Sequence, residues 1–359
     1  MASQKAAKKA KTLAFESERL PRPRFMRPAL LLMVPSEHHL RLAAQIGVTD
    51  IVCAYPGSSY EEVAALQAKI AAFGLRMTVI ERLVPHDKIV HGKAGREEQI
   101  ENFKTLIRSM GRAGVKTLCY NWMPADDWSR CSVTEPERGG ALVTNWIEGQ
   151  VSALADEEGR AHDDGTATSA EQLWLNLEYF LKAVVPVAEE AGVELALHPD
   201  DPPVPVLRGK PQIMYNVAAM ERAAQLVPSP ANGLCFCQGT FASGGEDVLA
   251  GIRRVAPYIK YVHFRDVVGA VPHFQECFQD NGKTDMAACM AAYKEAGVRD
   301  VAIRPDHVPT LDGEENDHPG YEMLGRLWAV GYINGMMDTI EHGAKRAKKE
   351  EAELSQPGI

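Results

Sequence analysis

The chain has 359 residues, a formal charge of −9, 45% hydrophobic residues and 24% charged residues. This length suits one large domain or two ordinary ones, and the composition is that of a folded globular protein rather than a disordered chain. The acidic balance disfavours a nucleic-acid partner, which needs a basic surface, and no apolar run reaches the roughly 18 to 20 residues of a membrane span.

Both ends of the chain look like tails. Residues 1–24 are basic and then broken by prolines, and they lack the apolar segment of a secretory signal. Residues 343–359 form a charged run, which leaves residues 25–342 as one catalytic domain. The seven cysteines include no CxxC pair, so we expect reduced thiols and a cytoplasmic protein.

Between these tails, short apolar segments alternate with helical patterns, and several helices end on a glycine just before the next strand. The predicted strands cover 29–33, 50–54, 76–81, 115–121, 193–199, 233–239, 258–265 and 300–306. The predicted helices cover 37–46, 60–73, 96–112, 170–191, 217–226, 247–255, 285–296 and 322–342. Continuous apolar strands that alternate with helices are typical of a parallel sheet covered on both faces. Eight such repeats predict an α/β fold, a (β/α)8 TIM barrel.

One connection is much longer than the others. Residues 122–168 form a polar segment between the fourth strand and its helix. Connections of this length in a compact domain are usually functional or disordered. We expect a long loop insertion here that serves as a lid or as a subunit contact.

The last four predicted strands each end with a potential metal ligand. Active sites of (β/α)8 enzymes lie at the C-terminal ends of the strands, so these side chains converge on one rim. The four residues are His198, Cys237, His263 and Asp306. Taken singly, each is more simply explained as a satisfied polar residue or a buried thiol. Their coincidence at one rim favours a mixed site for a divalent cation.

Further polar residues reach the same rim. Asn121, Trp122 and Arg130 follow the fourth strand, where they would line a pocket, and Arg130 suits a bidentate contact with a carboxylate. The alternative is an aromatic loop that only packs over the barrel. His307 and Tyr321 follow the eighth strand and are candidate proton-transfer groups beside the metal.

Several blocks of the sequence resemble the mannonate dehydratase family, in family order across roughly residues 75 to 340. They include Cys119 to Pro124, the HPDDPP run from His198, the RPDH run from Arg304, and Pro319 to Tyr321. The resemblance implies a (β/α)8 metal enzyme that removes water from D-mannonate to give 2-keto-3-deoxy-D-gluconate.

The resemblance also implies roles for individual residues. It places a divalent cation, usually Mn2+, on His198, Cys237, His263 and Asp306, although this ligand set also suits Fe2+, Co2+ or Zn2+. It implies proton transfer by His307 and Tyr321, with Tyr321 as our first choice for the base. We assign contacts with a small hydroxy acid substrate to Asn121, Trp122, Arg130, Asp200, Arg265 and Arg304. A homo-oligomer is also implied.

The resemblance is weakest in the N-terminal third. Family members have an Arg-Trp-Tyr-Gly strand and a later His pair, where this chain has Leu31-Leu32-Met33 and Cys53-Ala54-Tyr55-Pro56. Gln279 stands where the family usually has a His. The metal and proton-transfer positions are retained while several substrate contacts differ. The alternatives are therefore a metal-dependent isomerase or epimerase, a lyase for another hydroxylated substrate such as an aromatic one, or a non-catalytic binding barrel.

Overall fold

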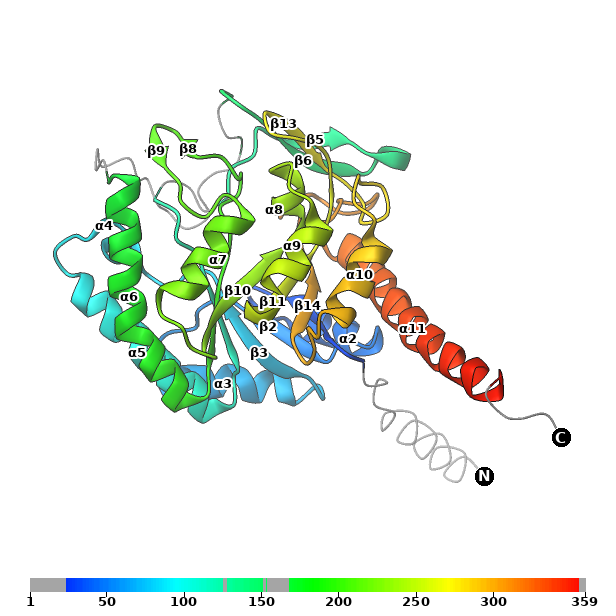
Figure 1. The fold of residues 1–359 in the computed structure, drawn as a ribbon, viewed down its shortest axis with the longest axis horizontal. Helices are drawn as coiled ribbons and strands as arrows, with labels where there is room; N and C mark the ends of the chain where they lie inside the picture. The colour runs from blue at the N-terminus through cyan, green and yellow to red at the C-terminus, as the bar shows by residue number, and fades with distance from the viewer. Residues whose placement is uncertain (1–23, 125–127, 151–152, 154–167, 355–359) are drawn as a thin grey trace, which may run out of the picture.

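The computed structural model describes residues 24–124, 128–150, 153 and 168–354. Eight parallel strands close into a barrel in which neighbours follow chain order (Figure 1). These strands are β1 (Arg27–Leu31), β2 (Asp50–Cys53), β3 (Arg76–Glu81), β4 (Thr117–Tyr120), β7 (Glu194–Leu197), β10 (Asn232–Cys237), β11 (Ile259–Phe264) and β14 (Ala302–Pro305). The predicted (β/α)8 barrel is confirmed.

Helices cover the outside of the barrel. They are α2 (Glu37–Gln45), α3 (Tyr60–Ala71), α4 (Asp87–His91), α5 (Arg96–Ala113), α6 (Ala170–Ala191), α7 (Val217–Leu226), α8 (Gln238–Ser243), α9 (Val248–Val255), α10 (Met286–Glu295) and α11 (Met323–Leu354). Short 3-10 turns lie at Arg138–Gly140 and Ala256–Tyr258. Side chains cap the N-termini of α2, α3, α6, α7, α9 and α10, each accepting a backbone N–H three residues later. Such caps satisfy donors that the helix itself leaves open. Helices α2, α3, α6 and α7 begin at the predicted residue, and α9 and α10 begin one residue later, because Asp247 and Asp285 are their caps.

The structure describes little of the predicted N-terminal tail but most of the predicted C-terminal one. Residues 1–23 lie outside the described residues, and Arg24 forms an ion pair of 2.8 Å with Asp338 of α11. Helix α11 continues to Leu354, beyond the predicted end at 342, and projects from the barrel (Figure 1). No helix in the described part of the chain is both long and apolar enough to cross a membrane.

Two apolar layers hold the barrel together. The larger one fills the space between strands and helices. The smaller one lies inside the barrel and consists mostly of small residues, such as Ala29, Ala196 and Ala302. Tyr261 belongs to this inner layer, and its hydroxyl donates to Glu81 Oε2 at 2.9 Å. The barrel interior therefore turns polar at the C-terminal ends of the strands.

A second, antiparallel sheet lies at this polar end of the barrel (Figure 1). Its strands, in spatial order, are β12 (Val267–Ala270), β13 (His273–Glu276), β6 (Leu142–Ile147) and β5 (Ser132–Pro136). Strands β5 and β6 come from the long connection after β4. Part of that connection, including residues 125–127 and 154–167, lies outside the described residues. A smaller hairpin pairs β8 (Val206–Leu207) with β9 (Lys210–Pro211).

Candidate metal centre

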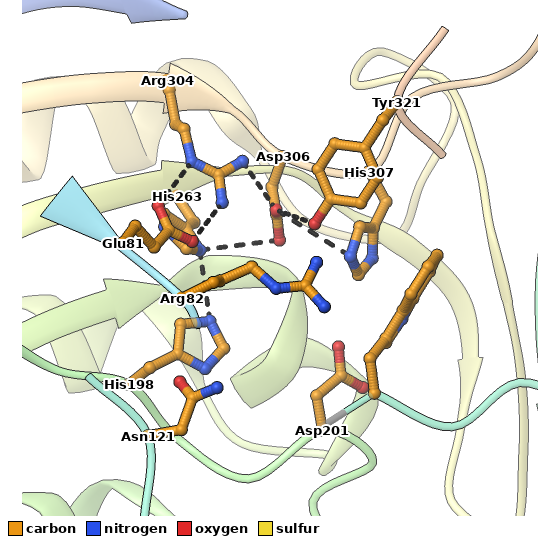
Figure 2. A pocket seen from close by; sticks show the side chains of 11 residues that line it. Glu81, Arg82, Asn121, His198, Asp201, His263, Arg304, Asp306, His307 and Tyr321 are labelled. Carbon is orange, nitrogen blue, oxygen red and sulfur yellow. Dashed lines mark hydrogen bonds and ion pairs between the residues drawn. The ribbon is translucent and has the colours of Figure 1, made fainter. Parts of the chain in front are cut away.

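The four predicted metal ligands lie together at the C-terminal rim of the barrel. Nε2 of His198 lies 3.2 Å from Nδ1 of His263 (Figure 2). Oδ2 of Asp306 lies 3.7 Å from the same Nδ1 and 3.5 Å from Sγ of Cys237. Two imidazole nitrogens bound to one tetrahedral metal at ~2.1 Å are about 3.4 Å apart. The spacing of the two His residues therefore fits a shared cation.

The other ring nitrogen of each His lies near an oxygen atom. Nδ1 of His198 lies 2.6 Å from the carbonyl oxygen of Pro199, and Nε2 of His263 lies 3.4 Å from Oε2 of Glu81. Metal-binding His residues usually donate their second N–H to a carbonyl or carboxylate, which fixes the tautomer and aims the other nitrogen at the metal. The two imidazoles, the thiol and the carboxylate together form a set of soft and hard donors that could hold a divalent cation.

Two arginines hold Asp306 in place. Arg304 Nη1 donates to its Oδ1 at 2.8 Å, and Arg265 Nε donates to its Oδ2 at 2.7 Å. Burial alone would raise the pKa of Asp306, but the charges of His307, Arg304, His263 and Arg265 outweigh it and hold the pKa well below its usual range. Asp306 is therefore ionised at neutral pH, the form in which a carboxylate can bind a cation.

The two predicted proton-transfer residues lie beside this cluster. The hydroxyl of Tyr321 lies 3.5 Å from Oδ1 of Asp306, and the rings of His307 and Tyr321 meet edge to face at 5.3 Å. Trp128 stacks on His307 at 4.4 Å between ring centroids. Burial raises the pKa of Tyr321 well above its usual range and lowers the pKa of His307. Burial therefore favours the uncharged form of both groups.

A buried network of charges surrounds His307. Nδ1 of His307 lies 2.9 Å from Oε1 of Glu276, a residue of the antiparallel sheet. Arg130 and Arg265 both contact Glu276 and both contact Asp201, at distances from 2.6 to 3.0 Å. Burial opposes the ionisation of Glu276 and Asp201, but the two arginines and His307 keep both pKa values low. Two cations therefore balance two carboxylates next to the metal centre.

A small cavity of about 30 Å³ lies among the side chains at this rim. Its lining consists of Glu81, Arg82, Asn121, Trp128, His198, Asp201, His263, Arg304, Asp306, His307 and Tyr321 (Figure 2). Of the substrate-binding residues predicted from sequence, Asn121 and Arg304 are in this lining.

The other four predicted substrate contacts are not in the lining of this cavity. Trp122 is 1% exposed, stacks on Phe180 and donates to the carbonyl of Leu173 at 3.2 Å, so it packs in the core. Arg130 and Arg265 are fully buried, and their guanidinium groups bind protein carboxylates. Asp200 is buried and accepts the backbone N–H of Met214 at 2.6 Å.

Five residues of the site were not predicted as such. Glu81, Arg82, Asp201 and Trp128 line the cavity, and Glu276 contacts His307 behind it. Glu81 ends β3 and Arg82 follows it, so the same rule that selects polar residues at strand ends identifies both. Glu276 has no such signal, because it belongs to a strand outside the barrel.

Comparison with known proteins agrees with this geometry. The family model described as D-mannonate dehydratase (UxuA) matches residues 36–159 and 161–347. The chain belongs to this family. The mannonate dehydratase of Streptococcus pneumoniae is 35% identical over 306 residues, which cover 77% of this chain and 82% of that protein. The Streptococcus agalactiae mannonate dehydratase is 33% identical over 310 residues, covering 80% of this chain and 88% of the relative.

A solved structure of a mannonate dehydratase has the same fold as this chain. The crystal structure of mannonate dehydratase from Streptococcus suis serotype 2 matches with a TM-score of 0.81 and 33% identity, covering 90% of this chain and 95% of that one. An L-ribulose 3-epimerase matches with a TM-score of 0.58 at 16% identity, covering 92% of this chain and 100% of that one, which shows a shared barrel fold only. Membership of the mannonate dehydratase family makes the chain a carbon–oxygen lyase by class.

Proposed function

We propose that this chain is a metal-dependent hydro-lyase that removes water from D-mannonate and releases 2-keto-3-deoxy-D-gluconate. The observation that carries the proposal is that His198, His263 and Asp306 line one cavity together with the His307–Tyr321 pair, with Sγ of Cys237 3.5 Å from Asp306. The match to relatives named mannonate dehydratase supports the choice of substrate.

The difficult step is removal of the proton on C2, because a carbon next to a carboxylate is a poor acid. A divalent cation held by His198, Cys237, His263 and Asp306 would stabilise the negative charge that develops on the carboxylate. The ligand chemistry suits Mn2+ and equally Fe2+, Co2+ or Zn2+.

The chain's own residues move the protons. Ionised Glu276 accepts a hydrogen bond from the Nδ1–H group of His307. This hydrogen bond keeps the ring proton on Nδ1, so that the lone pair on Nε2 is available to take the C2 proton. Tyr321, as a protonated phenol, donates to the hydroxyl that leaves C3. This assignment reverses our first choice of base from sequence, and the hydrogen bond from His307 to Glu276 is the reason.

The products balance this scheme. The C3 hydroxyl leaves as water with the proton that Tyr321 donates, and His307 holds the C2 proton. Passage of that proton from His307 to the Tyr321 phenolate restores both residues, and the enol becomes the 2-keto acid when its hydroxyl proton moves to C3. We further propose that the protein is cytoplasmic, which its seven free cysteines support. We also propose that the chain forms a homo-oligomer, and light scattering of the purified protein measures its oligomeric state.

Incubation of the full chain with D-mannonate and Mn2+ tests the function. Mass spectrometry should show a product lighter by one water that reacts as a 2-keto-3-deoxy acid. Formation of an isomer of unchanged mass would instead indicate an isomerase or epimerase. No reaction of D-mannonate, with turnover of another hydroxy acid, would reject D-mannonate as the substrate.

A further inference from the structure

A second group of metal-binding side chains lies inside the barrel, next to the metal centre. Cys119 of β4, Cys235 of β10 and His263 of β11 bring two thiols and one imidazole together, with their ligand atoms within 4.8 Å of one another. All three side chains are buried. His263 is also a candidate ligand of the metal centre, so the two groups share this residue.

The strand register explains the position of the two thiols. Cys237 pairs with His263 across β10 and β11, and Cys235 pairs with Tyr261 two residues earlier, so Cys235 points the same way as Cys237 but lies deeper in the barrel. Cys119 belongs with Cys235 to the inner layer of the barrel, and the two thiols are hydrogen-bonded to each other. Two thiolates on one tetrahedral cation at ~2.3 Å are about 3.8 Å apart, so this spacing fits a shared cation.

One ring nitrogen of His263 is not satisfied by the protein. Nδ1 lies 3.2 Å from Nε2 of His198, whereas Nε2 is buried and has no hydrogen-bond partner among the residues that the structure describes. Oε2 of Glu81 lies 3.4 Å from this Nε2, beyond the usual hydrogen-bond length of about 2.7–3.2 Å (Figure 2). Arg304 and Tyr261 hold the Glu81 carboxylate at 2.8 and 2.9 Å, so it is not free to approach. A buried nitrogen without a partner costs free energy, which a bound cation would recover.

The thiol pair lies close to the metal cavity. Cys119 is in the wall of a small cavity of about 10 Å³. This cavity shares Arg82 and Asn121 with the metal cavity at the rim. A cation at the rim is therefore separated from Cys119 by few side chains.

The ligand types decide which cations suit the second group. Thiolates favour soft cations such as Zn2+ and Cd2+, whereas carboxylates favour hard ones such as Mn2+ and Mg2+. The second group has two thiols and no carboxylate within the same distance, while the metal centre has one thiol and Asp306. Burial raises the pKa of both inner thiols, so a cation must bind sulfur strongly to displace their protons.

We propose that Cys119, Cys235 and His263 form a second cation site, selective for soft divalent cations such as Zn2+ and Cd2+, that competes with the metal centre for His263. Binding forms two metal–sulfur bonds and one metal–nitrogen bond and releases two thiol protons to water. A neutral imidazole has only one nitrogen with a free lone pair, so a second cation would require loss of the remaining ring proton. The two sites therefore exclude each other, and only this competition rests on the proposed metal centre.

Titration of the Mn2+-free full chain with Cd2+ tests the site. Cadmium bound to thiolates gives an ultraviolet charge-transfer band whose intensity follows the number of Cd–S bonds. The wild-type chain should show two such bonds for the first Cd2+ bound. Cadmium NMR of the same complex reports the number of thiolate ligands without any substitution, and a signal typical of a single thiolate would overturn the proposal.

The double variant Cys119→Ala/Cys235→Ala locates the effect. Alanine already occupies neighbouring positions of the inner layer at Ala196 and Ala302, so this layer accepts its size. The variant should bind Cd2+ at least about tenfold more weakly and show about half the band intensity. Cys289→Ala, at an equally buried free thiol of α10, is the matched control and should behave as the wild type.

A second titration tests the competition. Cd2+ added to the Mn2+-loaded wild-type chain should release Mn2+, measured by mass spectrometry of the metals, and the double variant should need at least about tenfold more Cd2+ for the same release. Equal release from both proteins, or an unchanged band in the folded double variant, would overturn the proposal. Neither titration needs turnover, so a chain that leaves D-mannonate unchanged would refute the proposed function while the test of this site still stands.

Discussion

Glu276, on a strand outside the barrel, holds Nδ1 of His307, at the end of the last barrel strand, at 2.9 Å. The two residues thus connect the antiparallel sheet with the proton-transfer group. Because Glu276 also contacts Arg130 and Arg265, its carboxylate has a fixed position. The sheet therefore positions His307 as well as covering the site.

Glu276→Gln should lower kcat by at least about tenfold and change KM less, because the neutral amide no longer fixes the tautomer of His307. Loss of a buried charge between two arginines should also lower stability, by about 3–5 kcal/mol. Steady-state kinetics and thermal melting measure the two effects. His273→Gln, at an exposed position on the same strand, is the control. An unchanged kcat in folded Glu276→Gln would exclude this role.

Mn2+ should raise the melting temperature of the wild-type chain, because a ligand that binds only the folded state stabilises it. At 100 times its dissociation constant the gain is about 2.7 kcal/mol. His198→Ala should lose most of this gain and most of the bound metal, measured by mass spectrometry of the metals. His38→Ala, at an exposed position, should retain both. Full metal content in His198→Ala would show that His198 is not a ligand.

The barrel was predictable from sequence because its signals are local. The predicted bounds of β3, α6 and α7 agree with the structure at every residue. Apolar strands, capping side chains and glycine stops each act within a few residues of one another. The four candidate metal ligands followed from the same pattern, since strand ends in a closed barrel meet at one rim.

Contacts between distant segments were not predictable in this way. Strand β6 pairs with β13 more than a hundred residues later in the chain, and the sequence carries no local signal for that pairing. Asp200 and Asp201 look equivalent in the sequence, but only Asp201 meets Arg130 and Arg265. Its role depends on side chains from other elements, and so does the role of Glu276.

The substitution Asp266→Asn should make the stability of the folded protein depend less on rising pH. Burial raises the pKa of Asp266, although Thr284 donates to both carboxylate oxygens. The folded state therefore keeps this proton to a higher pH than the unfolded state, and stability falls as pH rises above the ordinary carboxyl pKa of about 3.9. The melting temperature of Asp266→Asn relative to wild type should increase as the pH rises from about 4, until the folded-state carboxyl of the wild type is ionised.

Thr284→Val is the matched variant for this prediction. It removes the hydroxyl that donates to Oδ1 of Asp266 at 2.7 Å and should raise the carboxyl pKa further. Its melting temperature should fall more steeply with pH than that of the wild type. Parallel curves for wild type, Asp266→Asn and Thr284→Val would contradict the assignment.

Two glycine-to-alanine substitutions should have opposite effects on stability. A β-carbon at Gly111 of α5 would lie 2.4 Å from the carbonyl oxygen of Ala191, at the contact with α6. Because this neighbour is backbone, the helices must move apart, at a cost of about 1–3 kcal/mol. A β-carbon at Gly331 of α11 meets nothing within 4 Å, so Gly331→Ala should stabilise by about 0.5–1 kcal/mol through the higher helix propensity of alanine. Chemical denaturation of both variants compares the two directly, and stabilisation by Gly111→Ala would show that α5 and α6 do not pack this closely.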